Sequence, residues 1–249
     1  MDLNLQGKVV LVTGGGGGIG AAVAAAFVAE GCVAYLGDVD AEAAARVATS
    51  LGGAAHPLVM DVGDARAVQR VVQGIVERHG RVDVLVNNAG IMKSGSLAEA
   101  SVEDWDEVCR VNLSGVFYCS KAVLAPMVER RSGRIVNIAS VSAWRGGGAI
   151  GNVLYAATKA GVVALTKGFA RELAPFGIGV NAIAPSVADT AMTHSLLTPE
   201  RRRAVTAAIP SGRLALPADV ARMAVILASD VSEYVTGETI AVDGGYLTR

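Results

Sequence analysis

A glycine run constrains this chain more than any other feature. Six of the seven residues from Gly14 to Gly20 are glycine. The apolar run 9–12 before them is typical of a buried parallel strand, and the alanine-rich segment 21–30 after them is typical of a helix. A flexible linker is the alternative, but linkers do not join a buried strand to a helix. A strand, a glycine turn and a helix together present backbone N–H groups to a phosphate, which predicts a bound nucleotide.

Strand and helix patterns alternate along the whole chain. We predict strands near 8–12, 32–36, 56–60, 82–86, 134–138, 178–183 and 238–242, and helices near 18–30, 41–51, 64–79, 101–129, 153–174 and 217–229. This alternation predicts an α/β fold, a doubly wound parallel sheet of about seven strands with helices on both faces. With no linker or composition break, residues 1–249 read as a single domain. Proline is expected to interrupt the fourth helix near Pro126, and the irregular segment 186–211 reads as a lid.

Polar residues follow several of the predicted strands. Asp38, Asp61 and the pair Asn87-Asn88 stand at strand ends, which in a parallel sheet line one crevice together with the glycine turn. Asp38 follows Gly20 by 18 residues, close to the spacing of an acid that binds the adenosine ribose. The alternative is that Asp38 or Asp40 caps the helix at 41–51, a role that suits Asp40.

Composition excludes several classes of protein. A net charge of −1 gives no basic surface for a nucleic acid or an anionic membrane. The N-terminus lacks the pattern of a signal peptide, and no stretch has the roughly 18 uninterrupted apolar residues of a membrane span. The unpaired cysteines Cys32, Cys109 and Cys119 indicate reduced thiols and a cytoplasmic protein. Histidine, cysteine and acidic residues show no metal-ligand spacing, so we expect no metal.

Tyr155 and Lys159 stand four residues apart and therefore share one helix face. A phenol titrates near pH 10, which is too high for a general base at neutral pH. A lysine ammonium at roughly 4 Å stabilises the phenolate by about 4 kcal/mol at an effective dielectric near 20, enough to lower its pKa by about 3 units. Most such pairs are exposed residues without a function. This pair, however, follows a strand that ends at Ser140, whose hydroxyl can hold a substrate oxygen in place.

Over nearly its whole length the chain resembles the short-chain dehydrogenase/reductase family. The matching stretches are Thr13-Gly14 with Gly18-Ile19-Gly20, Asp61-Val62, Asn87-Asn88-Ala89-Gly90, Asn112, Ser140, Tyr155-Ala156-Ala157-Thr158-Lys159, Asn181-Ala182-Ile183-Ala184-Pro185 and Asp243-Gly244-Gly245. Each stretch alone is a weak match, but their common order and spacing make a chance resemblance implausible.

The resemblance implies a catalytic group of Ser140, Tyr155 and Lys159, extended by Asn112, which would hold a proton-relaying water near Lys159. It implies a homotetramer, which the apolar face of 160–173 fits as well as core burial does. The cofactor-binding residues that we expect are Gly14, Gly18, Ile19, Gly20, Asp38, Asp61, Val62, Asn88, Ala89, Gly90, Tyr155, Lys159, Pro185, Val187, Ala188 and Thr190.

Two departures from the family pattern bear on the site. The catalytic serine commonly precedes the tyrosine by 13 residues, whereas Ser140 precedes it by 15 and Ser142 by 13. We favour Ser140 because it stands at the strand end, with two extra residues absorbed by glycines 146–148. Ser186 replaces the glycine that usually follows Pro185, which leaves the geometry at the start of the lid open and makes Ser186 a candidate to face the substrate.

The sequence favours NAD over NADP. Neither Gly15 nor the segment 38–40 offers a basic residue to a 2′-phosphate, which Asp38 would repel. In the glycine run, the family pattern makes Gly14, Gly18 and Gly20 the required positions and residues 15–17 permissive. Gly16→Ser is therefore expected to be mild, and Gly18→Val to abolish NAD binding.

The substrate is the least determined part. Loops 92–97, 142–153 and 186–210 suggest a medium-sized secondary alcohol or ketone with an apolar part; Arg145 either pairs with a substrate carboxylate or is a solvated loop arginine. Candidate substrate residues are Ser142, Trp144, Asn152 and His194. The leading hypothesis is an NAD-dependent alcohol dehydrogenase or carbonyl reductase. The alternatives are a 3-oxoacyl carrier-protein reductase and, remotely, a non-catalytic protein that senses NAD.

Overall fold

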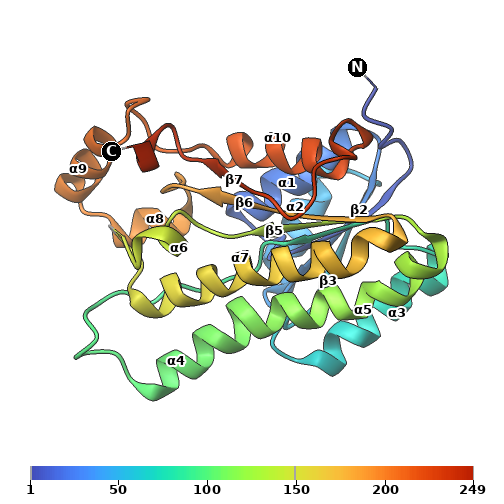
Figure 1. Cartoon of the computed structure of the whole chain (residues 1–249), viewed down its shortest axis with the longest axis horizontal. Coiled ribbons are helices and arrows are strands. Elements are labelled where there is room, and N and C mark those ends of the chain that lie inside the picture. Colours follow the sequence, from blue (N-terminus) through green and yellow to red (C-terminus); the bar gives the residue numbers. More distant parts are fainter. Residues whose placement is uncertain (1, 149, 249) are drawn as a thin grey trace.

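A computed structural model describes residues 2–148 and 150–248 and contains one seven-stranded parallel sheet (Figure 1). The strand order is β3-β2-β1-β4-β5-β6-β7. The strands are β1 Val9–Thr13, β2 Val33–Asp38, β3 Ala55–Val59, β4 Val84–Asn87, β5 Gly133–Ile138, β6 Ile178–Pro185 and β7 Thr239–Val242. All neighbouring strands pair in parallel, which confirms the predicted doubly wound fold.

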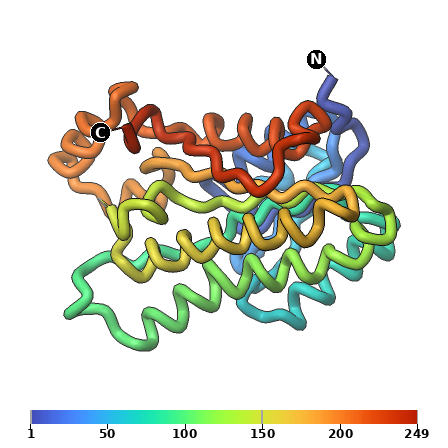
Figure 2. The backbone as a smooth tube through the Cα atoms, in the orientation of Figure 1, coloured from blue at the N-terminus to red at the C-terminus, as the bar shows by residue number. Residues whose placement is uncertain are grey.

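Helices cover both faces of the sheet, as the two views of the backbone show (Figures 1 and 2). One face carries α1 Gly18–Ala29, α2 Ala41–Leu51 and α10 Pro217–Ala228, and the other carries α3 Ala65–His79, α4 Val102–Cys109, α5 Gly115–Arg130 and α7 Val153–Leu173. Side chains alternate along β1, so Val10 joins the core under α1 and α10, while Leu11 joins the core under α3 and α5. Both cores are almost wholly aliphatic.

The predicted boundaries agree with the structure to within about two residues for most elements. Asp40 caps α2 by accepting a hydrogen bond from the Ala43 N–H at 2.9 Å, which confirms the role assigned to it. Asp64 caps α3 in the same way. Ala149, in the predicted glycine-rich loop 145–152, lies outside the described residues, as do Met1 and Arg249.

The prediction that Pro126 interrupts the fourth helix is wrong. Pro126 lies inside α5, which continues to Arg130. The irregularity is instead a π-helical turn, Arg110–Ser114, between α4 and α5, where the Gly115 N–H donates to the Arg110 carbonyl. Such π-turns are frequent at functional sites, and this one contains Asn112.

One continuous helical stretch, Val102–Arg130, is long and apolar enough to cross a membrane by length and composition alone. Its second half packs against the sheet, with Cys119, Val123 and Met127 in the core beneath α3. A buried position against the sheet accounts for this apolar composition.

Two helical segments lie beyond the carboxyl ends of the strands. A short helix, α6 Ser142–Arg145, follows β5 and precedes α7. The segment 186–211 after β6 contains α8 Ala191–Leu196 and α9 Pro199–Ala208, so the predicted irregular segment has two short helices. Both segments lie at the left in Figure 1, beside the start of α7.

Candidate active site

The glycine turn brings the chain into very close contact with itself. A Cβ on Gly20 would lie 2.0 Å from the Gly14 carbonyl oxygen, and a Cβ on Gly14 would lie 2.9 Å from the Ala89 Cα. Gly14 and Gly18 also have positive φ angles of 64° and 54°. These three positions are therefore restricted to glycine by contact or by backbone conformation.

The expectation that residues 15–17 are all permissive is wrong for two of them. A Cβ on Gly15 would lie 3.0 Å from the Leu36 Cα, which is backbone and does not move aside. A Cβ on Gly16 would lie 2.8 Å from an Asp38 carboxylate oxygen and 2.9 Å from the Ala43 Cβ. We therefore expect Gly16→Ser to disturb Asp38, and the mild effect predicted for this substitution stays untested. Of these three glycines, only Gly17 has no described atom within 4 Å of its Cβ position.

Asp38 closes the turn from the end of β2. Its Oδ2 accepts a hydrogen bond from the Gly16 N–H at 2.8 Å, and its Oδ1 accepts one from the Asp40 N–H at 3.0 Å. The carboxylate thus lies against the backbone of the glycine turn, and it also lines the cavity described below. Asp40 caps α2, so that role does not fall to Asp38, and binding of the ribose by Asp38 stays a prediction.

Asn88 and Thr13 hold the other side of the turn. The Asn88 Nδ2 donates to the carbonyls of Thr13 and Gly14 at 2.9 and 3.1 Å. The Thr13 hydroxyl accepts from the backbone N–H groups of Asn88 and Ala89, each at 2.9 Å. The matching motifs of β1 and β4 are therefore one hydrogen-bonded unit that fixes the shape of the turn.

A cavity of about 540 Å³ runs along the carboxyl ends of the strands. That volume lies within the roughly 300–1,000 Å³ usual for ligand sites. The predicted cofactor residues that line it are Gly14, Gly18, Ile19, Asp38, Asp61, Val62, Asn88, Ala89, Gly90, Tyr155, Lys159 and Thr190. Gly20 lies beneath the turn instead. A nucleotide cradle needs this combination of exposed backbone N–H groups, close-packed glycines and an acid at the ribose position, so the residues present fit a dinucleotide.

Asp61 is less free than the sequence suggests. Both of its carboxylate oxygens accept hydrogen bonds from the Arg110 Nη1, at 3.0 and 2.8 Å, and one also accepts from the Gly63 N–H. Arg110 lines the same cavity from the π-turn. Sequence reasoning missed this arginine, because nothing in the spacing of two residues 49 positions apart indicates their contact.

Ser140, Tyr155 and Lys159 meet where β5 ends and α7 begins. Ser140 and Tyr155 line the same cavity, and the Ser140 hydroxyl accepts a hydrogen bond from the Ser142 N–H at 3.1 Å. The Lys159 Nζ donates to the Ile138 carbonyl at 2.7 Å and lies 5.6 Å from the centroid of the Tyr155 ring. Asn152 caps α7 by accepting from the N–H groups of Leu154 and Tyr155, which orients the first turn of this helix.

Burial changes the proton affinities of this group. It raises the pKa of the Tyr155 phenol to about 12, although the nearby Ser140 hydroxyl works in the opposite direction. It lowers the pKa of the Lys159 ammonium to about 8. We expected Lys159 to lower the pKa of the Tyr155 phenol, but the pKa is raised in the protein without a cofactor. Lysine binds the Ile138 carbonyl, and burial penalises both charged forms.

Asn112 lies fully buried beside the catalytic group. Its Oδ1 accepts from the Ile91 N–H and its Nδ2 donates to the Ile91 carbonyl, each at 2.8 Å, with a weaker contact to Thr158. A Cβ on Gly90 would lie 3.3 Å from the Asn112 Oδ1 and 3.6 Å from the Lys159 Nζ. Gly90 therefore lies between these two side chains. Asn112 thus fixes the segment after β4 next to Lys159. A water relay through it stays a prediction.

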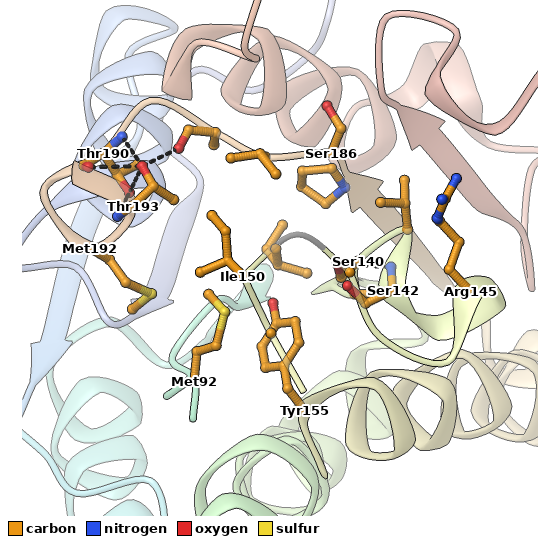
Figure 3. Close-up of a pocket in the computed structure, with 18 of the residues that line it drawn as sticks. Met92, Ser140, Ser142, Arg145, Ile150, Tyr155, Ser186, Thr190, Met192 and Thr193 are labelled. Atoms are coloured by element: carbon orange, nitrogen blue, oxygen red, sulfur yellow. Dashed lines mark hydrogen bonds between the residues drawn. The ribbon is translucent and has the colours of Figure 1, made fainter. Parts of the chain in front are cut away.

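A second cavity, of about 130 Å³, lies on the other side of Tyr155 (Figure 3). Ser140, Ser142, Arg145, Tyr155 and Ser186 line it in Figure 3, together with apolar side chains such as Met92, Ile150 and Met192. The predicted residues Pro185, Val187, Ala188 and Thr190 belong to this wall as well. Tyr246, which the sequence did not indicate, completes it from the C-terminal turn.

The structure does not bring the other three candidate substrate residues to this cavity. Trp144 is 49% exposed, Asn152 caps α7, and the His194 ring is hydrogen-bonded to Asp189. Asp189 also binds Arg202 at 2.7 Å, so these contacts connect α8 and α9. The sequence analysis expected no metal because it found no metal-ligand spacing. Among residues 2–148 and 150–248, the structure contains no cluster of three or more potential metal ligands.

Comparisons with known proteins agree with this geometry. A family model described as enoyl-(acyl carrier protein) reductase matches residues 14–247. The chain is 43% identical over 247 residues to 3-oxoacyl-[acyl-carrier-protein] reductase FabG of Thermotoga maritima, covering 98% of this chain and 99% of that protein. It is 39% identical over 243 residues to the enzyme of the same name from Escherichia coli, covering 98% of each.

Solved structures are equally similar. A putative NAD(P) dependent gluconate 5-dehydrogenase from Beutenbergia cavernae, with NADP bound at low occupancy, has a TM-score of 0.92 and 40% identity, and the match covers the whole of both chains. The structure of gox2181 has a TM-score of 0.94 and 34% identity, covering 100% of this chain and 98% of that one. The chain therefore belongs to the short-chain dehydrogenase/reductase family. Within that family it is an oxidoreductase of the nicotinamide-dinucleotide type, similar to the proteins named FabG.

Proposed function

We propose that this protein interconverts a secondary alcohol and a ketone with NAD(H), using Tyr155 as the general acid and base. The observation that carries this proposal is the position of Tyr155, which lines the smaller cavity together with Ser140 and the larger one together with Lys159. A substrate oxygen placed there meets both hydroxyl groups at once. The nicotinamide, when bound, supplies or accepts the hydride.

Each residue has a definite part in this reaction. Tyr155 gives its phenolic proton to the carbonyl oxygen in reduction and takes it back in oxidation. Ser140 donates a hydrogen bond to that oxygen as it becomes negative. Because burial raises the pKa of the phenol to about 12, the tyrosine is a proton donor at neutral pH, and an ammonium at Lys159 favours its ionised form.

Support for NAD rather than NADP comes from the end of β2. The Asp38 carboxylate holds the Gly16 N–H and lines the cofactor cavity. Arg110, the only arginine that lines that cavity in the described chain, is paired with Asp61. A 2′-phosphate beside Asp38 would meet a negative charge without a free arginine to offset it, a repulsion of a few kcal/mol. The NADP in the Beutenbergia cavernae structure is a property of that protein.

The cofactor preference is tested with both dinucleotides on the wild type and on Asp38→Asn. Asparagine keeps an acceptor for the Gly16 N–H but removes the charge. We expect kcat/KM to favour NAD(H) by about a hundredfold or more in the wild type. The ratio should fall at least tenfold in the variant. Equal efficiency of the wild type with both dinucleotides would contradict the proposal.

A second candidate function is the reduction of 3-oxoacyl groups carried on an acyl carrier protein. The names of the relatives favour it over a generic alcohol dehydrogenase, since those with 38–43% identity are called 3-oxoacyl-[acyl-carrier-protein] reductase. This reaction is the same ketone reduction at Tyr155 with a larger substrate. Turnover of acetoacetyl carrier protein compared with free ketones and alcohols, followed by NADH absorbance, distinguishes the two.

The remaining proposals follow the family. We propose a cytoplasmic homotetramer in which residues 1–249 form one domain and the segment 186–211 covers the substrate. The exposed apolar side chains Phe117 and Trp105 on α5 and α4 are compatible with contacts between subunits. Light scattering of the purified protein at several concentrations tests the tetramer.

Tyr155→Phe should abolish turnover while leaving NADH binding intact, which excludes a protein that only senses NAD.

A further inference from the structure

Arg145 is the only charged side chain among the described residues that line the smaller cavity. It ends α6, the short helix that follows Ser140, and it reaches the same cavity as Tyr155 (Figure 3). The surrounding side chains Met92, Ile150 and Met192 are apolar. A single cation in a mostly apolar wall, close to the reacting group, sets which substrates are favoured there.

The guanidinium is held in place without being neutralised. Its Cζ lies 4.5 Å from the centroid of the Tyr246 ring, a stacking arrangement that leaves the N–H groups at the edge of the guanidinium available. No acidic side chain among residues 2–148 and 150–248 forms an ion pair with Arg145, whereas Arg110, Arg202 and Arg213 each have an acidic partner.

Tyr246 is itself fixed by the C-terminal turn. The Asp243 carboxylate accepts hydrogen bonds from the N–H groups of Gly245 and Leu247, at 2.8 and 2.9 Å. Gly245 has a φ of 88°, and a Cβ there would lie 3.0 Å from Pro210. The turn therefore lies tightly against the end of α9, and it keeps the aromatic ring under Arg145.

We infer that Arg145 binds a carboxylate of the substrate, so that the protein acts on a small hydroxy acid and its oxo acid. This inference rests on the proposed function. An arginine presents paired N–H donors that match the two oxygens of a carboxylate. The cavity volume of about 130 Å³ lies below the roughly 300–1,000 Å³ of drug-sized ligand sites, which favours a short substrate.

The test compares substrates that differ only in the anionic group. Wild-type protein with NAD is assayed on short hydroxy acids and on the methyl esters of the same acids, which carry no charge. We expect kcat/KM to favour the acids by about 10- to 100-fold, the usual effect of a charge-assisted hydrogen bond. Arg145→Met should remove this preference, because it should raise KM for the acids by much more than KM for the esters.

Two further variants separate binding from a structural effect. Arg145→Lys keeps the charge but loses the paired donors, so it should restore only part of the preference for acids. Arg46→Met removes the same charge from the exposed surface of α2 and should change neither rate. Phosphate esters of hydroxy compounds, assayed alongside, show whether the bound anion is a carboxylate or a phosphate.

The outcomes distinguish this inference from the proposed function. Absence of turnover on acids, esters and acyl thioesters alike would overturn the proposed function itself. Turnover with equal efficiency on acids and esters, or an Arg145→Met variant that loses both activities to the same extent, would overturn the role of Arg145 alone. A phosphate ester preferred over every acid would likewise overturn the carboxylate.

Discussion

The two sides of the active-site crevice are built in different ways. On the glycine side, residues 13–20, 37–38 and 87–90, the shape comes from backbone groups in close contact and from short hydrogen bonds to the main chain. On the loop side, residues 140–148, 150–151, 186–193 and Tyr246, the shape comes from side chains of three segments far apart in sequence. The first arrangement tolerates almost no substitution, whereas the second can change residue by residue.

Substitutions on the glycine side are expected to have the largest effect on cofactor binding and stability, and they test this contrast most directly. Gly20→Val places carbon atoms where the Gly14 carbonyl oxygen lies, 2.0 Å from the ideal Cβ, so we expect loss of NADH binding and a strongly destabilised fold. Gly17→Ala is the matched control, because its Cβ position is open within the described chain. It should bind NADH within a few-fold of the wild type. Fluorescence titration with NADH and thermal unfolding measure both, and similar behaviour of the two variants would remove the contrast.

The two serines on the loop side give the next largest effect. Both serines line the same cavity as Tyr155, but Ser140 follows the end of β5 directly, whereas Ser142 lies in α6. We expect Ser140→Ala to lower kcat by about 10²- to 10³-fold, the usual effect of losing a donor to a developing oxyanion. Ser142→Ala should change it by less than tenfold. The reverse order in steady-state rates would move the catalytic role to the serine that precedes Tyr155 by 13 residues.

The buried charge of Lys159, which lies between the two sides, is expected to lower the stability of the fold. Its pKa is lowered from 10.5 to about 8 by burial, so the folded state binds fewer protons than the unfolded chain between those values. Its charge therefore destabilises the fold fully below pH 8, and this cost disappears as the pH rises towards 10.5. At about 1.4 kcal/mol for each pKa unit, the cost is about 3 kcal/mol.

Lys159→Met tests this cost, because methionine fills similar space without a charge. We expect an inactive protein whose free energy of unfolding in urea at pH 7 is higher by up to about 3 kcal/mol, less the loss of the bond to the Ile138 carbonyl. The gain should shrink between pH 8 and 10. A variant less stable than the wild type at pH 7 would show that the ammonium is well compensated in the fold.

The smallest effect is expected at the edge of the loop side. The His194 ring is bound to Asp189, but its side chain is 58% exposed and lies outside the cavity. His194→Ala should cost less than about 1 kcal/mol, as exposed ion pairs do, and leave kcat/KM within about twofold. A tenfold loss of kcat/KM would place this part of 186–211 in contact with the substrate.

Local patterns predicted most of the fold. The runs of apolar residues, the glycine run and the cap at Asp40 are all short-range signals, and the strands and helices follow them closely. The prediction at Pro126 failed because a proline within an otherwise favourable helix, packed on a sheet, does not stop it. The π-turn at Asn112 has no comparable sequence signal, since it depends on the packing of both flanking helices.

The sequence by itself determined the parallel sheet, the glycine turn and the shared helix face of Tyr155 and Lys159, because each depends on patterns within or next to one strand or helix. Tertiary structure alone decided that Arg110 holds Asp61, that Tyr246 stacks under Arg145, and that Trp144 and His194 lie away from the cavity. It also decided that Gly15 and Gly16 are closely confined. The physical reason is the same in each case: these contacts join segments whose separation along the chain carries no information about their distance in space.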